Sequence, residues 1–318
     1  MLSQFMKGAT VAALLLINAS PGYSQGYPNK LIRIVTAPVG SSADFLARMI
    51  AQGIAGPLGQ TVIVDNRASF VAAETVAKSP ADGYTIYFTG GTFWIGSLLE
   101  HVQYDPVKDF APITITHQQP NVLVVHPQLP AKSVKELIAL AKAKPGQLNF
   151  VGLGVGGSVQ LAGEVFKAMS GVNMTLVNYK LTATALSDVM TGQVQVFFAV
   201  ASTVAEQIKS GRLRALAITS ATPSALFPGM PTIAASGVPG YNVVGIYGVF
   251  APARTPAAVI SRLNQEINQS LNKPELKEKY VAAGLEVVGS TPEQLAAEVK
   301  SEMTMVSKVL KDAGNRAN

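Results

Sequence analysis

The feature that most constrains the fold of this chain is a regular alternation of short β-branched runs with alanine-rich stretches of helical spacing. Residues 31–35 predict a strand, which a Gly/Ser turn joins to a helix over 43–54. The pattern restarts at 148–151, where a glycine loop precedes a helix over 159–169. Such alternation is typical of βαβ units around mostly parallel sheets, so we predict an α/β fold.

The remaining elements follow the same pattern. Further strands are predicted at 62–65, 85–88, 122–125, 174–177, 194–198, 215–218 and 245–250. Further helices are predicted at 72–78, 133–143 and 183–190, with two more starting at Thr255-Pro256 and at a capping box over 290–293. An amphipathic stripe marks the last helix: Leu295, Val299, Met303 and Val306. Because no flexible linker separates the two blocks, we expect domains joined by crossing strands rather than by a tether.

Composition narrows the class of protein. The 318 residues suffice for two domains, each with its own core. The chain has no Cys, which excludes disulfides, thiolate nucleophiles and zinc–thiolate sites. Its net charge of +6 is spread along the chain without a basic block, so we expect no nucleic-acid partner.

The N-terminus has the layout of a secretory signal peptide. Lys7 precedes an apolar run over 11–17, and Gly22 and Ser24 stand at the −3 and −1 positions of a cleavage site. The run is too short to span a bilayer. We therefore expect residues 1–24 to be removed near Ser24 and the mature protein to work outside the cytoplasmic membrane. The alternative is a buried N-terminal helix.

Signatures of catalysis are weak. His101, His117 and His126 have no ligand partner at helical spacing, so no metal site is predicted. Residues 152–157 match G-x-G-x-x-G, but the place of the expected acid holds residues 178–180, Asn-Tyr-Lys. We therefore predict a protein without enzymatic activity and without cofactors. An exported hydrolase using Ser41, Ser42 or Ser158 stays open as an alternative, although no base is identifiable for these serines.

Three glycine-containing loops favour a binding site. Residues 38–42 open one helix, with Ser41 as N-cap and Asp44 three residues later; residues 152–158 open another, with Ser158 as cap. Residues 90–92 follow a strand and so lie at the carboxyl edge of its sheet. Backbone N–H groups at such loops bind anions, so we predict a ligand cleft between the two domains. The alternative is that the glycines only form turns and the serines only cap helices.

The chain resembles the exported solute receptors of the tripartite tricarboxylate transporter family, also called Bug proteins. The resemblance covers essentially the whole mature chain. It is carried by ordered stretches at 31–35, 65–67, 79–85, 104–110, 142–149, 179–180, 211–217, 231–232, 237–241 and 250–252.

The resemblance implies a type II periplasmic-binding-protein-like fold, in which two α/β domains are joined by two crossing strands with a ligand cleft between them. Domain 1 would comprise 25–123 plus 242–318, and domain 2 would comprise 124–241. The implied protein is a periplasmic monomer that captures a small carboxylate and hands it to the membrane permease subunits of a tripartite transporter. A ligand sensor for a membrane signalling partner, without a transport role, is the alternative that the sequence leaves open.

Family loops and neighbouring residues give a predicted set of ligand contacts. These are Val39, Gly40, Ser41, Ser42, Ser69, Phe70, Thr92, Phe93, Gly154, Gly156, Ser158, Tyr179 and Phe198.

The chain departs from the family pattern mostly at the ligand loops. Its first loop reads Pro-Val-Gly-Ser-Ser-Ala-Asp over 38–44, residues 68–72 lack the usual glycines, and Leu181 replaces another. The acid that typically follows Phe198 is absent, which argues against free amino acids as ligands.

Aromatic residues near these loops suggest the character of the ligand. Phe70, Phe93, Trp94 and Phe198 either line an apolar pocket, which favours an aromatic or otherwise hydrophobic carboxylate, or belong to the core. Arg67 is either a ligand contact or a structural ion-pair residue.

Overall fold

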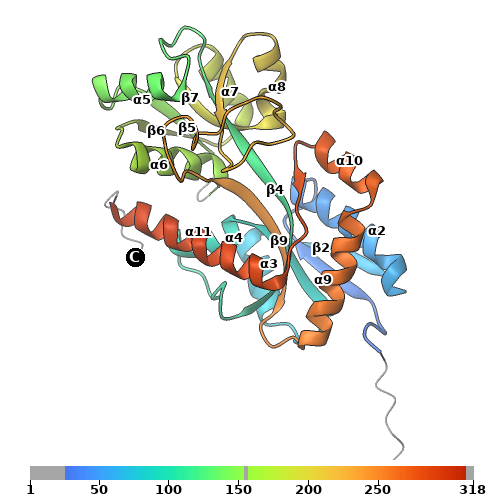
Figure 1. Cartoon of the computed structure of the whole chain (residues 1–318). Coiled ribbons are helices and arrows are strands. Elements are labelled where there is room, and N and C mark those ends of the chain that lie inside the picture. Colours follow the sequence, from blue (N-terminus) through green and yellow to red (C-terminus); the bar gives the residue numbers. More distant parts are fainter. Residues whose placement is uncertain (1–25, 154–156, 313–318) are drawn as a thin grey trace, which may run out of the picture.

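The structure is a computed structural model that describes residues 26–153 and 157–312. It has two α/β lobes, and two antiparallel strands cross between them: β4 (Phe110–Val125) and β9 (Val244–Pro252) (Figure 1). The ten strands found in these two ranges form one curled sheet, in which β4 belongs to both lobes. The predicted α/β class and the crossing strands are therefore confirmed.

The sheet of the first lobe is built on parallel strands. Its strands are β1 (Ile32–Thr36), β2 (Val62–Asn66), β3 (Thr85–Gly90) and the short β10 (Glu286–Val287). β1 pairs in parallel with both β2 and β3, whereas β9 is antiparallel to β3 and β10 is antiparallel to β4.

The second lobe repeats this arrangement. Its strands are β5 (Asn149–Leu153), β6 (Thr175–Tyr179), β7 (Val196–Val200) and β8 (Arg214–Ile218). β5 is parallel to β6 and β7, while β7 and β8 both pair antiparallel with the last residues of β4.

β4 is much longer than the sequence predicts, because only residues 122–125 read as a strand. Its first part pairs with β9 from Phe110 opposite Pro252 to Pro120 opposite Val244. The register shifts near Pro112, and pairing with β7 begins just after Pro120. Proline lacks a backbone donor and interrupts the ladder, so it conceals a strand whose pairing comes from distant parts of the chain.

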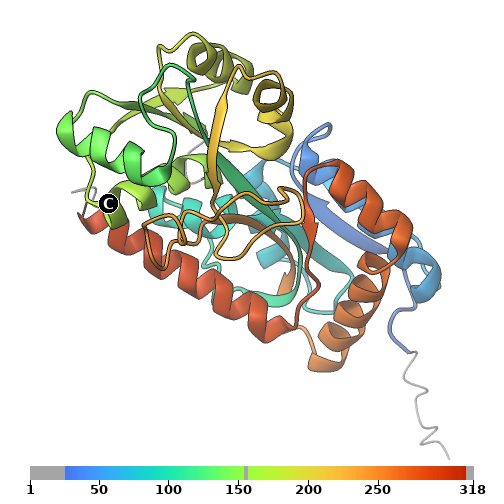
Figure 2. The same cartoon turned by 45° about the horizontal axis from the view of Figure 1, so that its top comes forward.

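Helices cover both lobes. The first lobe carries α2 (Ser42–Leu58), α3 (Ser69–Ala77), α4 (Thr92–Leu99), α9 (Ala257–Leu271) and α10 (Pro274–Ala282). The second carries α5 (Val134–Ala143), α6 (Ser158–Ser170), α7 (Thr182–Met190) and α8 (Ala201–Lys209). The last helix, α11 (Pro292–Asp312), runs from the first lobe to α6 of the second and contacts both α4 and α6 (Figures 1 and 2). No helix within the described ranges has the length and hydrophobicity of a membrane span.

One hydrophobic core of the first lobe lies between the sheet and helices α2 and α9. Ile32 and Ile34 of β1, both fully buried, share it with Ile50 of α2 and with Leu263 and Ile267 of α9. Burial of each such side chain contributes about 1.5–3 kcal/mol. This packing holds the N-terminal end of α2 at the boundary with the second lobe.

Three helix starts differ from the prediction. Pro256 rather than Thr255 is the N-cap of α9. Thr291 and Gln294 form the capping box of α11, one residue later than predicted: Thr291 Oγ1 accepts from the Gln294 N–H, and Gln294 Oε1 accepts from the Thr291 N–H. Ser290 is buried instead, and its hydroxyl accepts a hydrogen bond from the Ile115 N–H at 2.8 Å. Ser158 is the first residue of α6, whose N-cap is Gly157. The predicted Ser158 cap is therefore wrong.

Candidate ligand-binding site

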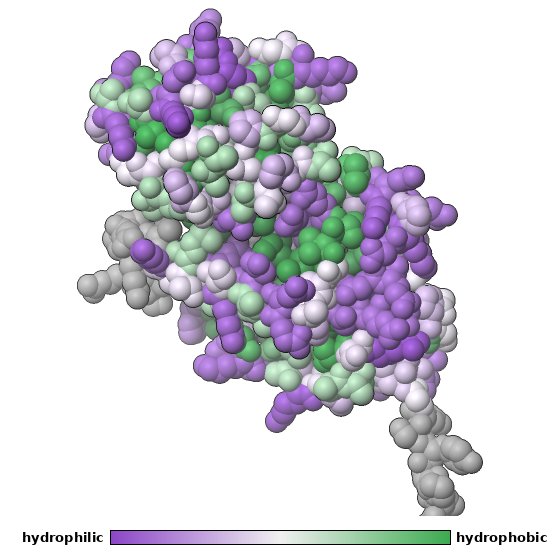
Figure 3. Space-filling model, viewed as in Figure 1, coloured by the Kyte–Doolittle hydropathy of each residue, from purple (hydrophilic) through white to green (hydrophobic). Residues whose placement is uncertain are grey.

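Two connected hollows lie where β4 and β9 cross between the lobes. The larger, of about 520 Å³, reaches from the start of α2 to the start of α8. The smaller, of about 130 Å³, lies between the Gly90–Thr92 loop and the start of α6. Gln119 of β4 and Tyr247 of β9 line both hollows, which together form the cleft. Figure 3 shows hydrophobic surface at the waist between the lobes.

The first loop is held by its own hydrogen bonds. Ser41 Oγ accepts from the Asp44 N–H at 3.1 Å, so Ser41 is the N-cap of α2, as predicted. Asp44 accepts from the Gly40 N–H at 3.0 Å and from the Asn66 amide at 2.9 Å. These bonds, led by that from Gly40, lower the pKa of Asp44. Asp44 therefore stays ionised and fixes the loop against β2.

Two helix N-termini meet at the larger hollow. Ser41 and Ser42 line it from α2, and Ser202 and Thr203 line it from the first turn of α8. First-turn N–H groups have no intrahelical acceptor and carry the positive end of the helix dipole. The larger hollow is therefore suited to an anion.

The predicted ligand contacts divide between the cleft and other places. Gly40, Ser41, Ser42, Thr92 and Ser158 line the cleft. Val39 is 74% exposed beside the first loop but lines neither hollow. Ser69 begins α3, and Gly154 and Gly156 lie outside the described residues.

Of the two roles left open for the aromatic residues, three of them have the core role. Phe93 is 2% exposed, and its ring lies 4.7 Å from that of Phe110 and 5.4 Å from that of Phe250. Trp94 is fully buried, as is Phe198, whose ring lies 5.6 Å from that of Phe166. These rings fill space between elements distant in sequence, so they are not available to a ligand.

Two further predicted contacts have structural roles. Phe70 is half-buried and packs against Gly96 of α4, where an added Cβ would lie 3.1 Å from the ring. Tyr179 donates a hydrogen bond from its hydroxyl to Asp188 at 2.7 Å, which ties β6 to α7. Burial and Asp188 raise the pKa of Tyr179 to about 12. Neither residue lines the cleft.

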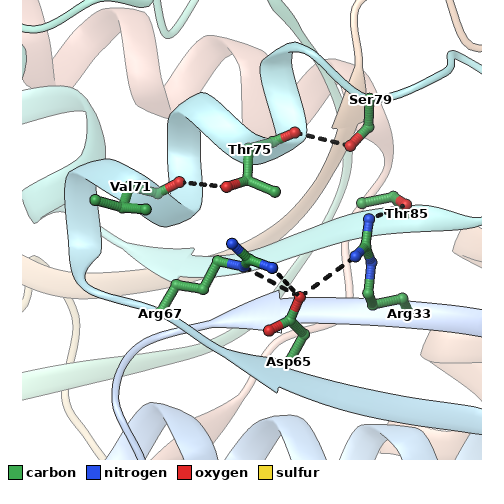
Figure 4. Close-up of polar contacts among 7 residues, drawn as sticks. All are labelled: Arg33, Asp65, Arg67, Val71, Thr75, Ser79 and Thr85. Atoms are coloured by element: carbon green, nitrogen blue, oxygen red, sulfur yellow. Dashed lines mark hydrogen bonds and ion pairs between the residues drawn. The ribbon is translucent and has the colours of Figure 1, made fainter.

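Arg67 belongs to an ion-pair cluster at the ends of β1 and β2. Its guanidinium donates two hydrogen bonds to Asp65, at 3.1 and 3.0 Å, and Arg33 approaches the same carboxylate at 3.4 Å (Figure 4). Arg33 also donates to Thr85 at 3.2 Å. Of the two alternatives for Arg67, the structural role is the one observed.

Several cleft residues were missed by the sequence analysis. They are Phe45, His117, Gln119, Ser202, Thr203, Tyr247 and Glu302. His117 is completely buried and stacks on Tyr247 with ring centroids 4.7 Å apart. Burial lowers the pKa of His117 to about 3, so its imidazole is neutral. No local motif marks these residues, because strand crossing and helix docking bring them together.

The chemistry of a hydrolase is not assembled in the cleft. The Ser41 hydroxyl accepts the hydrogen bond that caps α2. Among the described residues, Ser41, Ser42 and Ser158 form no hydrogen bond with a histidine. Within the same residues, no cluster of His, Asp and Glu is grouped to hold a metal. The arrangement instead offers backbone and hydroxyl donors to a bound anion.

Two α/β lobes that share crossing strands, with a cleft between them, define a solute-binding protein of the type II periplasmic class. Residues 46–314 match the family described as Tripartite tricarboxylate transporter family receptor. The chain belongs to this family of periplasmic solute-binding receptors.

Similar proteins span nearly the whole chain. One is a UPF0065 protein in the tcbD-tcbE intergenic region of Pseudomonas sp. (strain P51), 34% identical and covering 92% of this chain and 89% of its own. Another is BugT of Bordetella pertussis, 33% identical with 93% of both chains covered. Among solved structures, R. palustris Rpa4515 with adipate is 33% identical, covers 91% of this chain and 98% of its own, and superposes with a TM-score of 0.74.

Proposed function

We propose that this protein captures a small carboxylate in its cleft and delivers it to the membrane permease of a tripartite transporter, without catalysing a reaction. The observation that carries the proposal is that the N-termini of α2 and α8 open into one hollow from opposite lobes. A carboxylate held there would receive donors from both lobes, and so would stabilise their closed arrangement. The adipate in the 33% identical relative is a ligand of this class.

The walls of the larger hollow suit a ligand with a hydrophobic body. Phe45 is 54% exposed and lines the larger hollow with Leu46 and Leu285, while Tyr247 connects it to the smaller one. We therefore keep a hydrophobic carboxylate as the proposed ligand, with these residues replacing the buried rings as its contacts.

The domain limits and the site of action follow from the same proposal. Domain 1 would consist of 25–123 plus 242–318, domain 2 would consist of 124–241, and closure would bend the two crossing segments. The receptor would act as a monomer in the periplasm after removal of a signal peptide near Ser24.

Titration with aliphatic and aromatic mono-, di- and tricarboxylates, followed by calorimetry and thermal unfolding, tests the proposal. A ligand present at 100 times its Kd is expected to stabilise the protein by about 2.7 kcal/mol.

A substitution at Gly245 tests whether the ligand binds in the cleft, because an added Cβ at this glycine would lie 3.4 Å from Ser158 Oγ inside the cleft. Gly245→Phe is expected to weaken binding at least about 100-fold by keeping the lobes apart.

Gly56→Phe is the control for that variant, since Gly56 is exposed on α2 with nothing within 4 Å of an added Cβ. It is expected to bind as the wild type does. Absence of stabilisation by every carboxylate, or unchanged binding by Gly245→Phe, would contradict the proposed function.

A further inference from the structure

The smaller hollow contains an acid that comes from the C-terminal helix. Glu302 of α11 lines this hollow together with Gly91 and Thr92. Trp94 Nε1 donates a hydrogen bond to Glu302 Oε2 at 2.6 Å and so orients the carboxyl group. The other oxygen, Oε1, lies 3.7 Å from the position of an added Cβ on Gly91. Gly91 therefore places no side chain between this oxygen and the hollow.

The cleft is therefore electrically asymmetric. Helix N-termini line both hollows: those of α2 and α8 the larger, and those of α4 and α6 the smaller. The asymmetry comes from Glu302, which lines the smaller hollow and is the one Asp, Glu, Lys or Arg side chain among the described residues that line either hollow. An anion is favoured at the helix N-termini and repelled by an ionised carboxyl. A bound carboxylate should accordingly point its anionic end toward α2 and α8.

The groups around Glu302 are mostly apolar, with one further acid and one base. On its other side, Glu302 borders a groove with Glu298 and Lys308 of α11 as further charged residues, while α6 contributes apolar side chains such as Leu161 and Val165. Trp94 of α4 and Tyr247 of β9 contribute no charge. Burial and the neighbouring Glu298 raise the pKa of Glu302 to about 7, although the bond from Trp94 opposes this shift. Glu302 is thus mostly ionised at pH 8 and mostly protonated at pH 6.

We propose that Glu302 is a specificity-determining residue that accepts a hydrogen bond from a hydroxyl or amino group at the end of the ligand opposite its carboxylate. This inference rests on the proposed function and narrows its ligand class. A monocarboxylate with a hydroxyl or amino group at its far end can bind its carboxylate at the N-termini of α2 and α8 and donate a hydrogen bond to Glu302. Dicarboxylates are disfavoured because their second carboxylate would lie against Glu302.

This assignment changes one conclusion from the sequence. Members of the family typically have an acid after the residue that corresponds to Phe198, and this acid would pair with an amino group of the ligand. Its absence argued against ligands that carry an amino group. Glu302 supplies an acid to the same cleft from a helix more than a hundred residues further along the chain.

Matched ligand pairs provide the test. Calorimetry at pH 8 would compare 6-hydroxyhexanoate with adipate, and 4-(hydroxymethyl)benzoate with terephthalate, on wild type and on Glu302→Gln. In whichever pair has the size that the cleft accepts, the wild type is expected to bind the hydroxy acid at least about 10-fold more tightly than the dicarboxylate. Glu302→Gln is expected to reduce this preference by about the same factor. Fluorescence of Trp94, the single tryptophan, gives an independent reading of binding beside Glu302.

A pH series on the wild type tests the inference without a substitution. The preference for the hydroxy acid should shrink between pH 8 and pH 6, because protonated Glu302 no longer repels a carboxylate. The preference of Glu302→Gln should not change over that range. Glu298→Gln, on the same helix but outside the cleft lining, should keep the wild-type preference.

The two proposals fail in different ways. Binding of dicarboxylates as tightly as hydroxy acids, with no effect of Glu302→Gln, would overturn the role of Glu302 and leave the receptor function intact. Failure of every carboxylate to bind the wild type would overturn the receptor function, and the inference about Glu302 with it.

Discussion

Replacing Gly163 by valine is expected to lower the free energy of unfolding by about 3 kcal/mol, because this glycine is where α6 touches β5. A Cβ at Gly163 would lie 2.3 Å from Cε2 and 2.4 Å from Cδ2 of Phe150. Phe150 is completely buried and the Lys167 ammonium lies 5.3 Å from its ring centroid, so the ring has little space to withdraw. Urea unfolding followed by circular dichroism measures the change.

Gly56→Ala is the matched control for the Gly163 variant, since Gly56 is also helical but exposed, with nothing within 4 Å of an added Cβ. It should leave the protein equally stable or more stable by up to about 1 kcal/mol. In the Gly163→Val background, Phe150→Leu replaces the ring by a smaller side chain and should recover part of the lost free energy of unfolding. If the effects of Gly163→Val and Phe150→Leu on the free energy of unfolding were strictly additive, the contact between residues 163 and 150 would not limit the packing of α6.

Acidification from pH 6.5 to pH 4 is expected to lower the free energy of unfolding by about 3 kcal/mol through His117 alone. The pKa of this buried imidazole is lowered to about 3, against 6.5 for an unperturbed histidine. Between these values the unfolded chain binds a proton that the folded chain does not. The contribution of His117 to stability is therefore complete above pH 6.5 and is lost as the pH falls toward 3.

His117→Phe isolates this effect, because phenylalanine keeps the stack on Tyr247 and cannot be protonated. It removes His117 Nε2, a buried atom without a hydrogen-bond partner among the described residues, but also the 3.0 Å hydrogen bond between His117 Nδ1 and Thr116 Oγ1. The two effects oppose each other, so the change in stability at pH 7 is expected to stay within about 1 kcal/mol. The difference between variant and wild type, measured by urea unfolding, should grow by about 3 kcal/mol between pH 7 and pH 4, with a slope that approaches about 1.4 kcal/mol per pH unit below pH 6. A constant difference across that range would disprove a neutral buried His117.

Local signals in the sequence identified much of the scaffold. The parallel strands at 31–35 and 148–151, and the helices that follow them, appear within a few residues of their predicted limits. Ser41 caps α2 as predicted, because an N-cap depends on a hydroxyl and an N–H group three residues apart. The Thr291–Gln294 box replaced the predicted one because Ser290 is engaged by β4, a partner that local spacing does not reveal.

Site residues were harder to predict, since hydrophobicity does not tell whether a ring faces a cleft or a core. Phe93 and Phe198 are as apolar as Phe45, yet only Phe45 lines the cleft. The ring of Phe93 packs against Phe110 and Phe250, which lie on the two crossing strands. Their proximity arises because β4 and β9 pair, with Phe110 opposite Pro252 and Pro112 opposite Phe250, and this pairing has no counterpart in local sequence.

The order of short strands and alanine-rich helices was enough to determine the α/β class, and ordered stretches along the chain were enough to indicate the family. The loop that opens α2 was expected at the cleft, whereas tertiary packing alone decided which other groups reach it: the N-terminus of α8, Gln119 on a strand concealed by prolines, and Glu302 from the last helix. The physical reason is the distance along the sequence over which each interaction acts. Propensity and capping act over a few neighbouring residues, whereas charge, burial and access to a ligand depend on which distant side chains the folded sheet and helices bring together.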